Sequence, residues 1–172
     1  MNVLFLSPTV DTAGVGIGLK RAFDQYGGEW HARHVRRYDS WLRYDADIQA
    51  EPDDPTVQRL WAEADVLVIL EQPLAAAWGP RKPTIVYHLG TFFRRQIGTL
   101  HEQCQAFGAL EVADMHDLIR RAPYPLPWLP DILDPVPIAT IRANEWEPSD
   151  TVRIVHAPTD RDIKRTLSLI HI

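Results

Sequence analysis

The sequence predicts an α/β fold built on a doubly wound, mostly parallel sheet. Short apolar runs such as "VLVIL" (Val66–Leu70) and "TIVY" (Thr84–Tyr87) lack polar alternation, which is typical of strands covered on both faces. Segments with helical spacing of apolar residues separate these runs. Such strand–helix alternation is the pattern of parallel βαβ units, so we expect a Rossmann-like domain.

The N-terminal part supplies the first three expected elements. Val3–Leu6 is rich in branched and aromatic residues and is the first strand. A helix is expected over residues 15–26, because apolar side chains recur there at helical spacing and Gly27-Gly28 follows as a stop. The alternating segment Trp30–Arg36 is expected to be the second strand.

The later elements follow the same logic. Asp54 before Pro55 has the form of a helix cap followed by proline in the first turn. The remaining elements are expected in this order: strands Val66–Leu70 and Thr84–Tyr87, a weaker strand Ala106–Leu110, and a helix Ala113–Arg121.

Proline content marks the end of the first domain, expected to cover residues 1–140. Six prolines between Pro123 and Pro137 exclude a central strand or a helix interior. Residues 141–151 are therefore interpreted as an interdomain linker. Residues 152–166 then have the pattern of the first strand and loop of a second domain.

The last six residues, Leu167–Ile172, interrupt that pattern with the apolar run "LSLIHI". One reading frame of a common sequencing-library transposon adapter encodes the same six residues. We therefore interpret this tail as adapter read-through and expect that the second domain is truncated.

Composition narrows the class of protein. The 172 residues carry a formal net charge of −5, which gives no indication of a nucleic-acid-binding surface. Cys104 is the only cysteine, so no internal disulfide can form. No apolar run reaches membrane-spanning length. We expect a cytoplasmic protein, for which peripheral membrane contact stays open.

Ligands of doubly wound sheets bind beyond the carboxyl ends of the strands, where strand order reverses. If the strand Thr84–Tyr87 lies beside Val3–Leu6, the glycine loop faces the segment "HLGTFFRR" across this crevice. Glycines allow close backbone approach to a ligand, and arginine binds phosphate or carboxylate. The expected site contains the following residues: Gly14, Gly16, Gly18, His88, Arg94 and Arg95.

Other classes of function find less support. The dinucleotide-binding fingerprint needs a small residue at position 19, where Leu19 stands, so an NAD(P)-binding module is the weaker alternative. A non-catalytic interaction protein on the same scaffold is the third reading. The histidines show no metal-ligand spacing, and no metal site is expected. Tyr38, with neighbouring aromatic residues, is a candidate for acceptor binding.

Four stretches of the chain resemble glycosyltransferases of the GT-B fold, in the family 4 or "group 1" manner. They are "NVLFLSPTVDTAGVGIGLK", "VYHLGTFFR", "WLPDILD" and "VRIVHAPTDRDIKRT". The first two resemble that family's glycine loop and its histidine–glycine–arginine segment, with Leu89 inserted after His88. The last resembles the phosphate loop of the second domain, with Arg165 in place of the usual glycine.

The resemblance implies a metal-independent transfer of a sugar from a nucleotide-sugar donor to a carbohydrate or glycan-type acceptor, without a further cofactor. Retention of the anomeric configuration is also expected from the resemblance. Gly14 and Gly16 would approach the donor phosphates, and Lys164 would neutralise the diphosphate with Arg161 as a substitute for the family's arginine. His88 would act at the transferring sugar, and Arg94 and Arg95 at the acceptor. Without most of the donor domain, the isolated chain is expected to be inactive.

Overall fold

A computed structural model describes residues 1–39 and 44–129 of the chain. These residues fall within one compact unit. The expected linker 141–151, the second-domain segment 152–166 and the tail Leu167–Ile172 lie outside the described residues. None of the described helices is long and apolar enough to cross a membrane.

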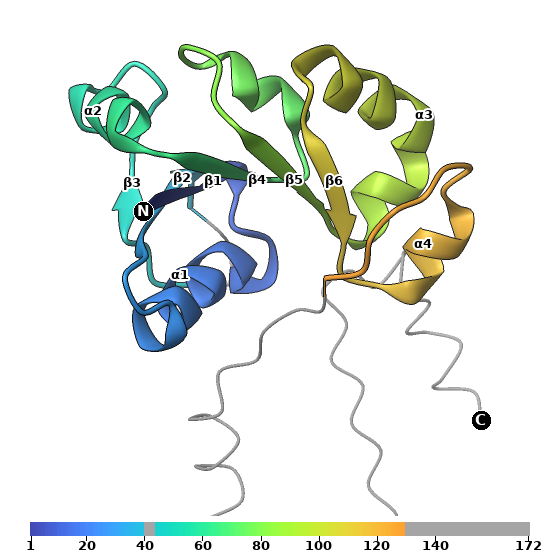
Figure 1. Cartoon of the computed structure of the whole chain (residues 1–172), viewed down its shortest axis with the longest axis horizontal. Coiled ribbons are helices and arrows are strands. Elements are labelled where there is room, and N and C mark those ends of the chain that lie inside the picture. The colour runs from blue at the N-terminus through green and yellow to red at the C-terminus, as the bar shows by residue number, and fades with distance from the viewer. Residues whose placement is uncertain (40–43, 130–172) are drawn as a thin grey trace, which may run out of the picture. The chain divides into compact units, whose positions relative to one another are not determined.

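A six-stranded, all-parallel sheet forms the centre of the domain (Figure 1). Its strand order is β3-β2-β1-β4-β5-β6, which confirms the predicted Rossmann-like, doubly wound α/β fold. The strands are β1 Asn2–Val10, β2 His31–Tyr38, β3 Ile48–Gln49, β4 Val66–Leu70, β5 Thr84–His88 and β6 Leu110–Ala113.

Helices cover both faces of the sheet, with α1 on one side and α2 and α3 on the other (Figure 1). The Asp54 carboxylate accepts a hydrogen bond of 2.7 Å from the Thr56 amide, which confirms the predicted cap of α2. The helices are α1 Val15–Tyr26, α2 Pro55–Glu63, α3 Gly90–Phe107 and α4 His116–Arg121, with 3-10 turns η1 Thr12–Gly14 and η2 Pro73–Ala77.

The predicted neighbour of the first strand was wrong. β4, not β5, pairs with β1, with Val3 opposite Val66, and β5 pairs with the far side of β4. The strand order differs from the expected one because of β3, a two-residue strand that the sequence pattern did not indicate. β3 takes the outer position beside β2, so the chain crosses back through α2 and places β4 against β1.

Two element boundaries near the C-terminal side were also wrong. Ala106 and Phe107 end α3 instead of opening a strand, because Gly108 stops the helix in the left-handed conformation with φ 63°. β6 then begins at Leu110, and α4 begins at His116 instead of Ala113. Because α3 starts at Gly90, Arg94 and Arg95 lie on a helix and not in the loop expected after β5.

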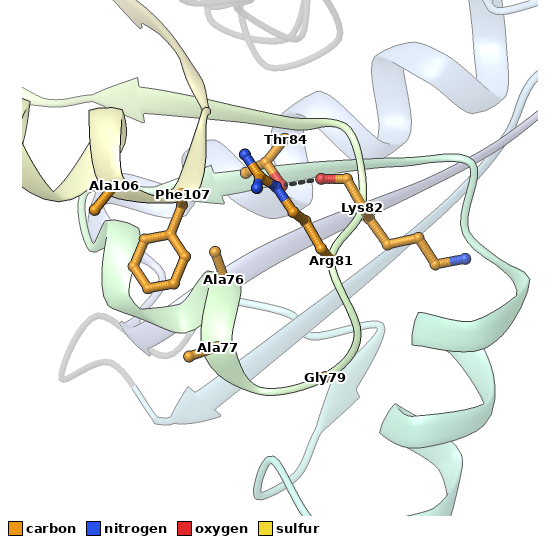
Figure 2. Close-up of a pocket in the computed structure, with 8 residues that line it drawn as sticks. All are labelled: Ala76, Ala77, Gly79, Arg81, Lys82, Thr84, Ala106 and Phe107. Carbon is orange, nitrogen blue, oxygen red and sulfur yellow. Dashed lines mark hydrogen bonds between the residues drawn. The ribbon is translucent and has the colours of Figure 1, made fainter.

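The amino ends of the strands carry a cavity of about 220 Å³, lined in part by Arg81, Lys82, Thr84 and Phe107 (Figure 2). The Lys82 ammonium donates hydrogen bonds of 2.8 Å to two carbonyls at the C-terminal end of α2, those of Ala62 and Ala64. Ligands of doubly wound sheets bind at the opposite, carboxyl ends. This cavity therefore lies away from the expected site.

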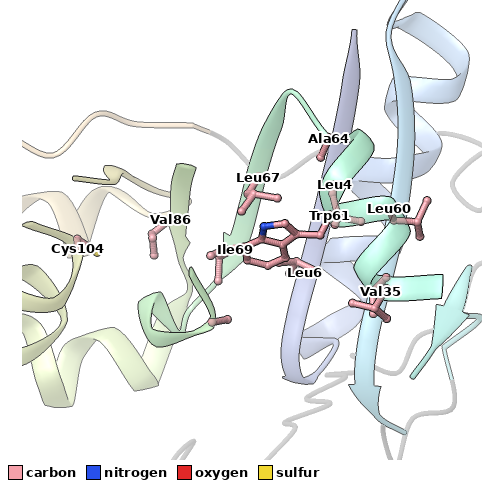
Figure 3. Close-up of a cluster of buried hydrophobic side chains, with 12 residues drawn as sticks. Leu4, Leu6, Val35, Leu60, Trp61, Ala64, Leu67, Ile69, Val86 and Cys104 are labelled. Carbon is pink, nitrogen blue, oxygen red and sulfur yellow. The ribbon is translucent and has the colours of Figure 1, made fainter. Parts of the chain in front are cut away.

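Alternate residues of β1 feed two separate hydrophobic cores. Val3 and Phe5 pack towards α1, while Leu4 and Leu6 pack towards α2. Trp61 of α2 lies within the second core, against side chains of the central strands (Figure 3). Its indole N–H donates a hydrogen bond of 2.9 Å to the Pro80 carbonyl, so its one polar atom is satisfied.

We predict that Trp61→Ala lowers the free energy of unfolding by about 3–5 kcal/mol, because it leaves a large cavity in this core. Urea unfolding measures the change. Tyr26→Ala is the matched control, since Tyr26 is 68% exposed on α1 and its loss should cost about 0.5 kcal/mol. Equal losses for the two variants would contradict the assignment of Trp61 to the core.

Candidate functional site

The strand order reverses between β1 and β4, so the ligand-binding crevice of this topology lies between their carboxyl ends. Among the described residues, two that are not glycine have a positive φ, and both flank that point. Ala13 (φ 55°) follows β1, and Glu71 (φ 64°) follows β4 directly. Each conformation costs about 1–3 kcal/mol, and such strain clusters at functional sites. We therefore take this edge as the candidate site.

Asp11 occupies the N-terminus of α1 from inside the protein. Its fully buried carboxylate accepts hydrogen bonds from the Gly16 amide at 2.7 Å and from the Ile17 amide at 3.0 Å. A helix N-terminus leaves its first amides unpaired and attracts negative charge, and here an internal carboxylate meets both demands. These two amides are consequently not free to bind a donor phosphate.

Close packing accounts for both glycines that were expected to bind phosphate. A Cβ atom on Gly16 would lie 2.4 Å from His34 Nε2 and 2.8 Å from Ser7 Oγ. Gly14 has a φ of 73°, and a Cβ there would lie 2.9 Å from the Tyr44 ring. The local structure requires glycine at both positions without any ligand. Contact of Gly14 and Gly16 with donor phosphates stays a prediction, and Gly16 would have to make it without its amide, which is bound to Asp11.

Ser7, His34 and Asp11 form a buried polar network beneath the α1 N-terminus, and each is at most 1% exposed. Ser7 Oγ lies 2.9 Å from His34 Nε2 and 3.4 Å from Asp11 Oδ1, whereas His34 Nε2 is 4.0 Å from Asp11. A nucleophilic triad needs the histidine between the serine and the acid. Here the serine lies in the middle, so the network has the arrangement of a structural core.

Burial lowers the pKa of His34 below its usual value of 6.5, although the nearby Asp11 and Asp47 carboxylates act in the opposite direction. The ring is therefore neutral at physiological pH. Its Nδ1 atom has no hydrogen-bond partner within the described ranges.

His88 ends β5, one strand beyond β4, and is fully buried. Its Nε2 lies 2.9 Å from a Glu111 carboxylate oxygen, and its ring packs on Phe93 with centroids 4.3 Å apart. Burial alone would raise the pKa of Glu111, but hydrogen bonds from His88, His101 and Tyr124 lower it below its usual value. The sugar-directed role of His88 stays a prediction, and it requires the ring to become accessible.

The three residues predicted to bind the acceptor have different surroundings. Arg94 is engaged in a two-point ion pair with Asp117, with N–O distances of 2.9 and 3.0 Å. Arg95 is exposed on the same helix. Tyr38 is 45% exposed at the carboxyl end of β2, in register with Val10 at the end of β1. Tyr38 thus reaches the candidate edge, while the Arg94 guanidinium already has a partner.

The structure brings Gly14, Gly16 and Tyr38 to the carboxyl ends of β1 and β2, while β4 separates this group from His88. Arg161 and Lys164 lie outside the described residues. Sequence reasoning missed Asp11, His34 and Glu71. An aspartate shortly before a helix is a capping signal that could have identified Asp11. No signal marks the strained backbone of Glu71.

Comparisons with protein-family models, with curated proteins and with solved structures found no match.

Gly16→Ala should destabilise the fold, because the new methyl group would overlap His34 and Ser7 in a buried network. We predict a loss of about 1–3 kcal/mol in unfolding free energy, measured by chemical denaturation. Gly98→Ala is the control, since a Cβ at this exposed position of α3 meets open space. That change should stabilise the protein by about 0.5–1 kcal/mol. A neutral Gly16→Ala variant would contradict the packing described here.

His34 should make stability depend on pH. Below its usual value of 6.5 the unfolded histidine binds a proton that the buried ring resists, so folding stability falls as pH falls. His34→Gln removes this effect, so only the wild type should lose free energy of unfolding for this reason as the pH falls from about 7 to about 5. The difference in unfolding free energy between wild type and variant should therefore narrow, by at most about 1.4 kcal/mol per pH unit. Urea unfolding at several pH values tests this.

The matched control for this series is His31→Gln, because His31 is exposed at the start of β2. Its pH profile should run parallel to that of the wild type. A parallel profile for His34→Gln as well would show that the His34 ring does not resist protonation.

Proposed function

We propose that this domain is the acceptor-side half of a GT-B type glycosyltransferase that transfers a sugar from a nucleotide-sugar to a carbohydrate or glycan-type acceptor. The observation that carries the proposal is the Asp11 carboxylate at the N-terminus of α1, within an open Rossmann-like sheet. The proposal rests on this feature together with the four stretches that resemble the family.

Nucleotide-binding domains of this topology place a phosphate group at the N-terminus of the first helix. Here a phosphate would meet the Asp11 carboxylate. Two unit charges about 4 Å apart repel by about 4 kcal/mol at an effective dielectric constant of 20. This repulsion opposes the alternative of a free-standing NAD(P)-binding module. The same repulsion agrees with a two-domain enzyme in which the other domain binds the nucleotide.

The carboxyl edge of the sheet offers an exposed surface for an acceptor. Several large side chains at the strand ends and just beyond them are more than a third exposed: Val10, Tyr38, Met115, Trp128 and Leu129. Aromatic residues such as Tyr38 and Trp128 combine an apolar face with a polar tip. Such a mixture suits a ligand that has both hydroxyl groups and apolar faces, as carbohydrates do.

The proposed chemistry builds positive character on the sugar and negative charge on the departing phosphate. Fixed cations stabilise this transition state more than the ground state, and by resemblance Lys164 and Arg161 have that role. His88 would orient the sugar or share a proton. Its Nδ1 atom has no partner among the described residues, so it is the ring atom available for such a contact.

Two measurements on the purified chain test the proposal. On a glycan array, we expect binding to carbohydrate acceptors that Tyr38→Ala weakens about 10-fold, a loss of roughly 1.4 kcal/mol. Tyr26→Ala is the control, because Tyr26 is exposed on α1, away from the candidate edge, and its removal should leave binding unchanged.

Thermal unfolding with NAD⁺ or NADP⁺ is the second measurement, since a ligand that binds only the folded state raises the melting temperature. We expect no shift, because Asp11 blocks the helix N-terminus. A saturable shift with NAD(P)⁺, together with no glycan binding, would overturn the proposal in favour of the nucleotide-binding module.

A further inference from the structure

Four potential metal ligands converge between β5, α3 and β6. His88 ends β5, His101 and Cys104 lie one helical turn apart on α3, and Glu111 lies in β6. One ligand atom from each of His88, Cys104 and Glu111 lies within 4.8 Å of the other two. His101 Nδ1 lies 2.5 Å from the second Glu111 oxygen. We call these four residues the His-Cys-Glu cluster.

We propose that the His-Cys-Glu cluster binds a divalent transition-metal cation, with Zn²⁺ as the preferred ion. The site lies outside the crevice between β1 and β4. It shares His88 with the proposed transferase, but metal binding does not require transferase activity. It also departs from the expectation drawn from histidine spacing alone, which did not consider His101-x-x-Cys104 as a pair.

The donor atoms match the preferences of zinc. Zinc binds imidazole nitrogen, thiolate sulfur and carboxylate oxygen, commonly four at a time in a tetrahedron. With bonds of about 2.0–2.3 Å, tetrahedral ligand atoms lie roughly 3.3–3.7 Å apart. The ligand atoms of His88, Cys104 and Glu111 lie within 4.8 Å of one another, so each needs a shift of about 1 Å or less to reach such spacings.

The charge balance suits a buried site. His88 and Cys104 are fully buried, and the Glu111 side chain is only 8% exposed. One Zn²⁺ with one thiolate, one carboxylate and two neutral imidazoles has no net charge, which avoids the penalty of an unpaired buried ion. Binding would release the Cys104 thiol proton, and the ring proton that each imidazole directs at Glu111 would move to its other ring nitrogen.

Residues around the cluster are arranged like the outer shell of a metal site. The Tyr124 hydroxyl donates a hydrogen bond of 2.9 Å to Glu111, and its ring stacks on His101 with centroids 3.6 Å apart. The Gln105 amide lies 3.0 Å from Nε2, the nitrogen of His101 that faces away from Glu111. Such contacts orient metal ligands and raise affinity.

Cys104 also belongs to the core cluster of the α2 face (Figure 3), so the metal would tie α3 to the sheet at the rim of that core. With the metal on His88 Nε2, the remaining ring proton lies on Nδ1. Within the described ranges, His88 Nδ1 has no hydrogen-bond partner, so it can carry this proton.

The experiment uses the purified full chain, freed of metal with a chelator and titrated with Co²⁺ and then Zn²⁺. We expect one equivalent of Co²⁺ to give the visible bands of tetrahedral cobalt and the near-ultraviolet thiolate-to-cobalt band. Zn²⁺ should abolish both by displacement. A titration without the thiolate band, or without stoichiometric binding, would overturn the proposal.

Variants locate the site. Cys104→Ala and Glu111→Gln should each weaken Zn²⁺ binding at least about 100-fold, and Tyr124→Phe about 10- to 100-fold. His31→Gln and Glu102→Gln are the controls, because both residues are exposed outside the cluster, and affinity should not change. Unchanged affinity in the cluster variants would mean adventitious binding and would also overturn the proposal.

If a cluster variant fails to fold, X-ray absorption at the zinc edge of the wild-type protein decides instead. One sulfur and three nitrogen or oxygen neighbours support the site. The sulfur neighbour would be assigned to Cys104, because this is the only cysteine in the chain. A shell without sulfur would exclude the proposed metal site.

Discussion

The carboxylate of Asp11 organises the carboxyl edge of the sheet. It lies fully buried at the end of β1 and accepts hydrogen bonds from the amides of Gly16 and Ile17. These bonds fix where α1 begins and how closely that helix approaches β1 and β2. Gly16 has no side chain because His34 and Ser7 occupy the adjoining space. The same interaction places negative charge where related topologies receive phosphate, and this links a feature of folding to the choice of ligand.

A second buried carboxylate has a comparable role on the other side of β4. Glu111 collects hydrogen bonds from His88, His101 and Tyr124, and these keep its pKa below the usual value despite its burial. The network beneath the α1 N-terminus thus combines Asp11 with one histidine, and the His-Cys-Glu cluster combines Glu111 with two histidines. Buried charge of this kind is stable only when fully paired. The first network fulfils that condition with helix amides. The second fulfils it with hydrogen bonds from three side chains and also has the composition to bind a metal ion.

Sequence patterns were sufficient for the fold class and for the long or strongly apolar elements, including β1, β4, β5 and the capped helix α2. Short apolar runs and capping residues are local signals that tertiary contacts seldom override. The pattern failed at β3, because a strand of two residues has no periodicity, and this failure misplaced β4 and β5 in the sheet. A local signal cannot reveal strand order.

The candidate site was predictable only in part. Tyr38 does reach the carboxyl edge, and its exposure could be expected from its position at a strand end. The capture of the α1 amides by Asp11 depends on the path of the loop after β1. The convergence of His88 with His101, Cys104 and Glu111 depends on the packing of α3 against two strands. Neither is encoded in residue spacing alone.

The first helix of this domain is capped internally by Asp11, and we infer that it does not receive phosphate. Amide NMR tests it directly, through the Gly16 and Ile17 resonances of the isotope-labelled chain during titration with pyrophosphate and with NAD⁺. We predict that both amides are protected from hydrogen exchange and that neither resonance moves. Saturable shifts of these two resonances would contradict the account, because they would show that the helix N-terminus binds phosphate in place of Asp11.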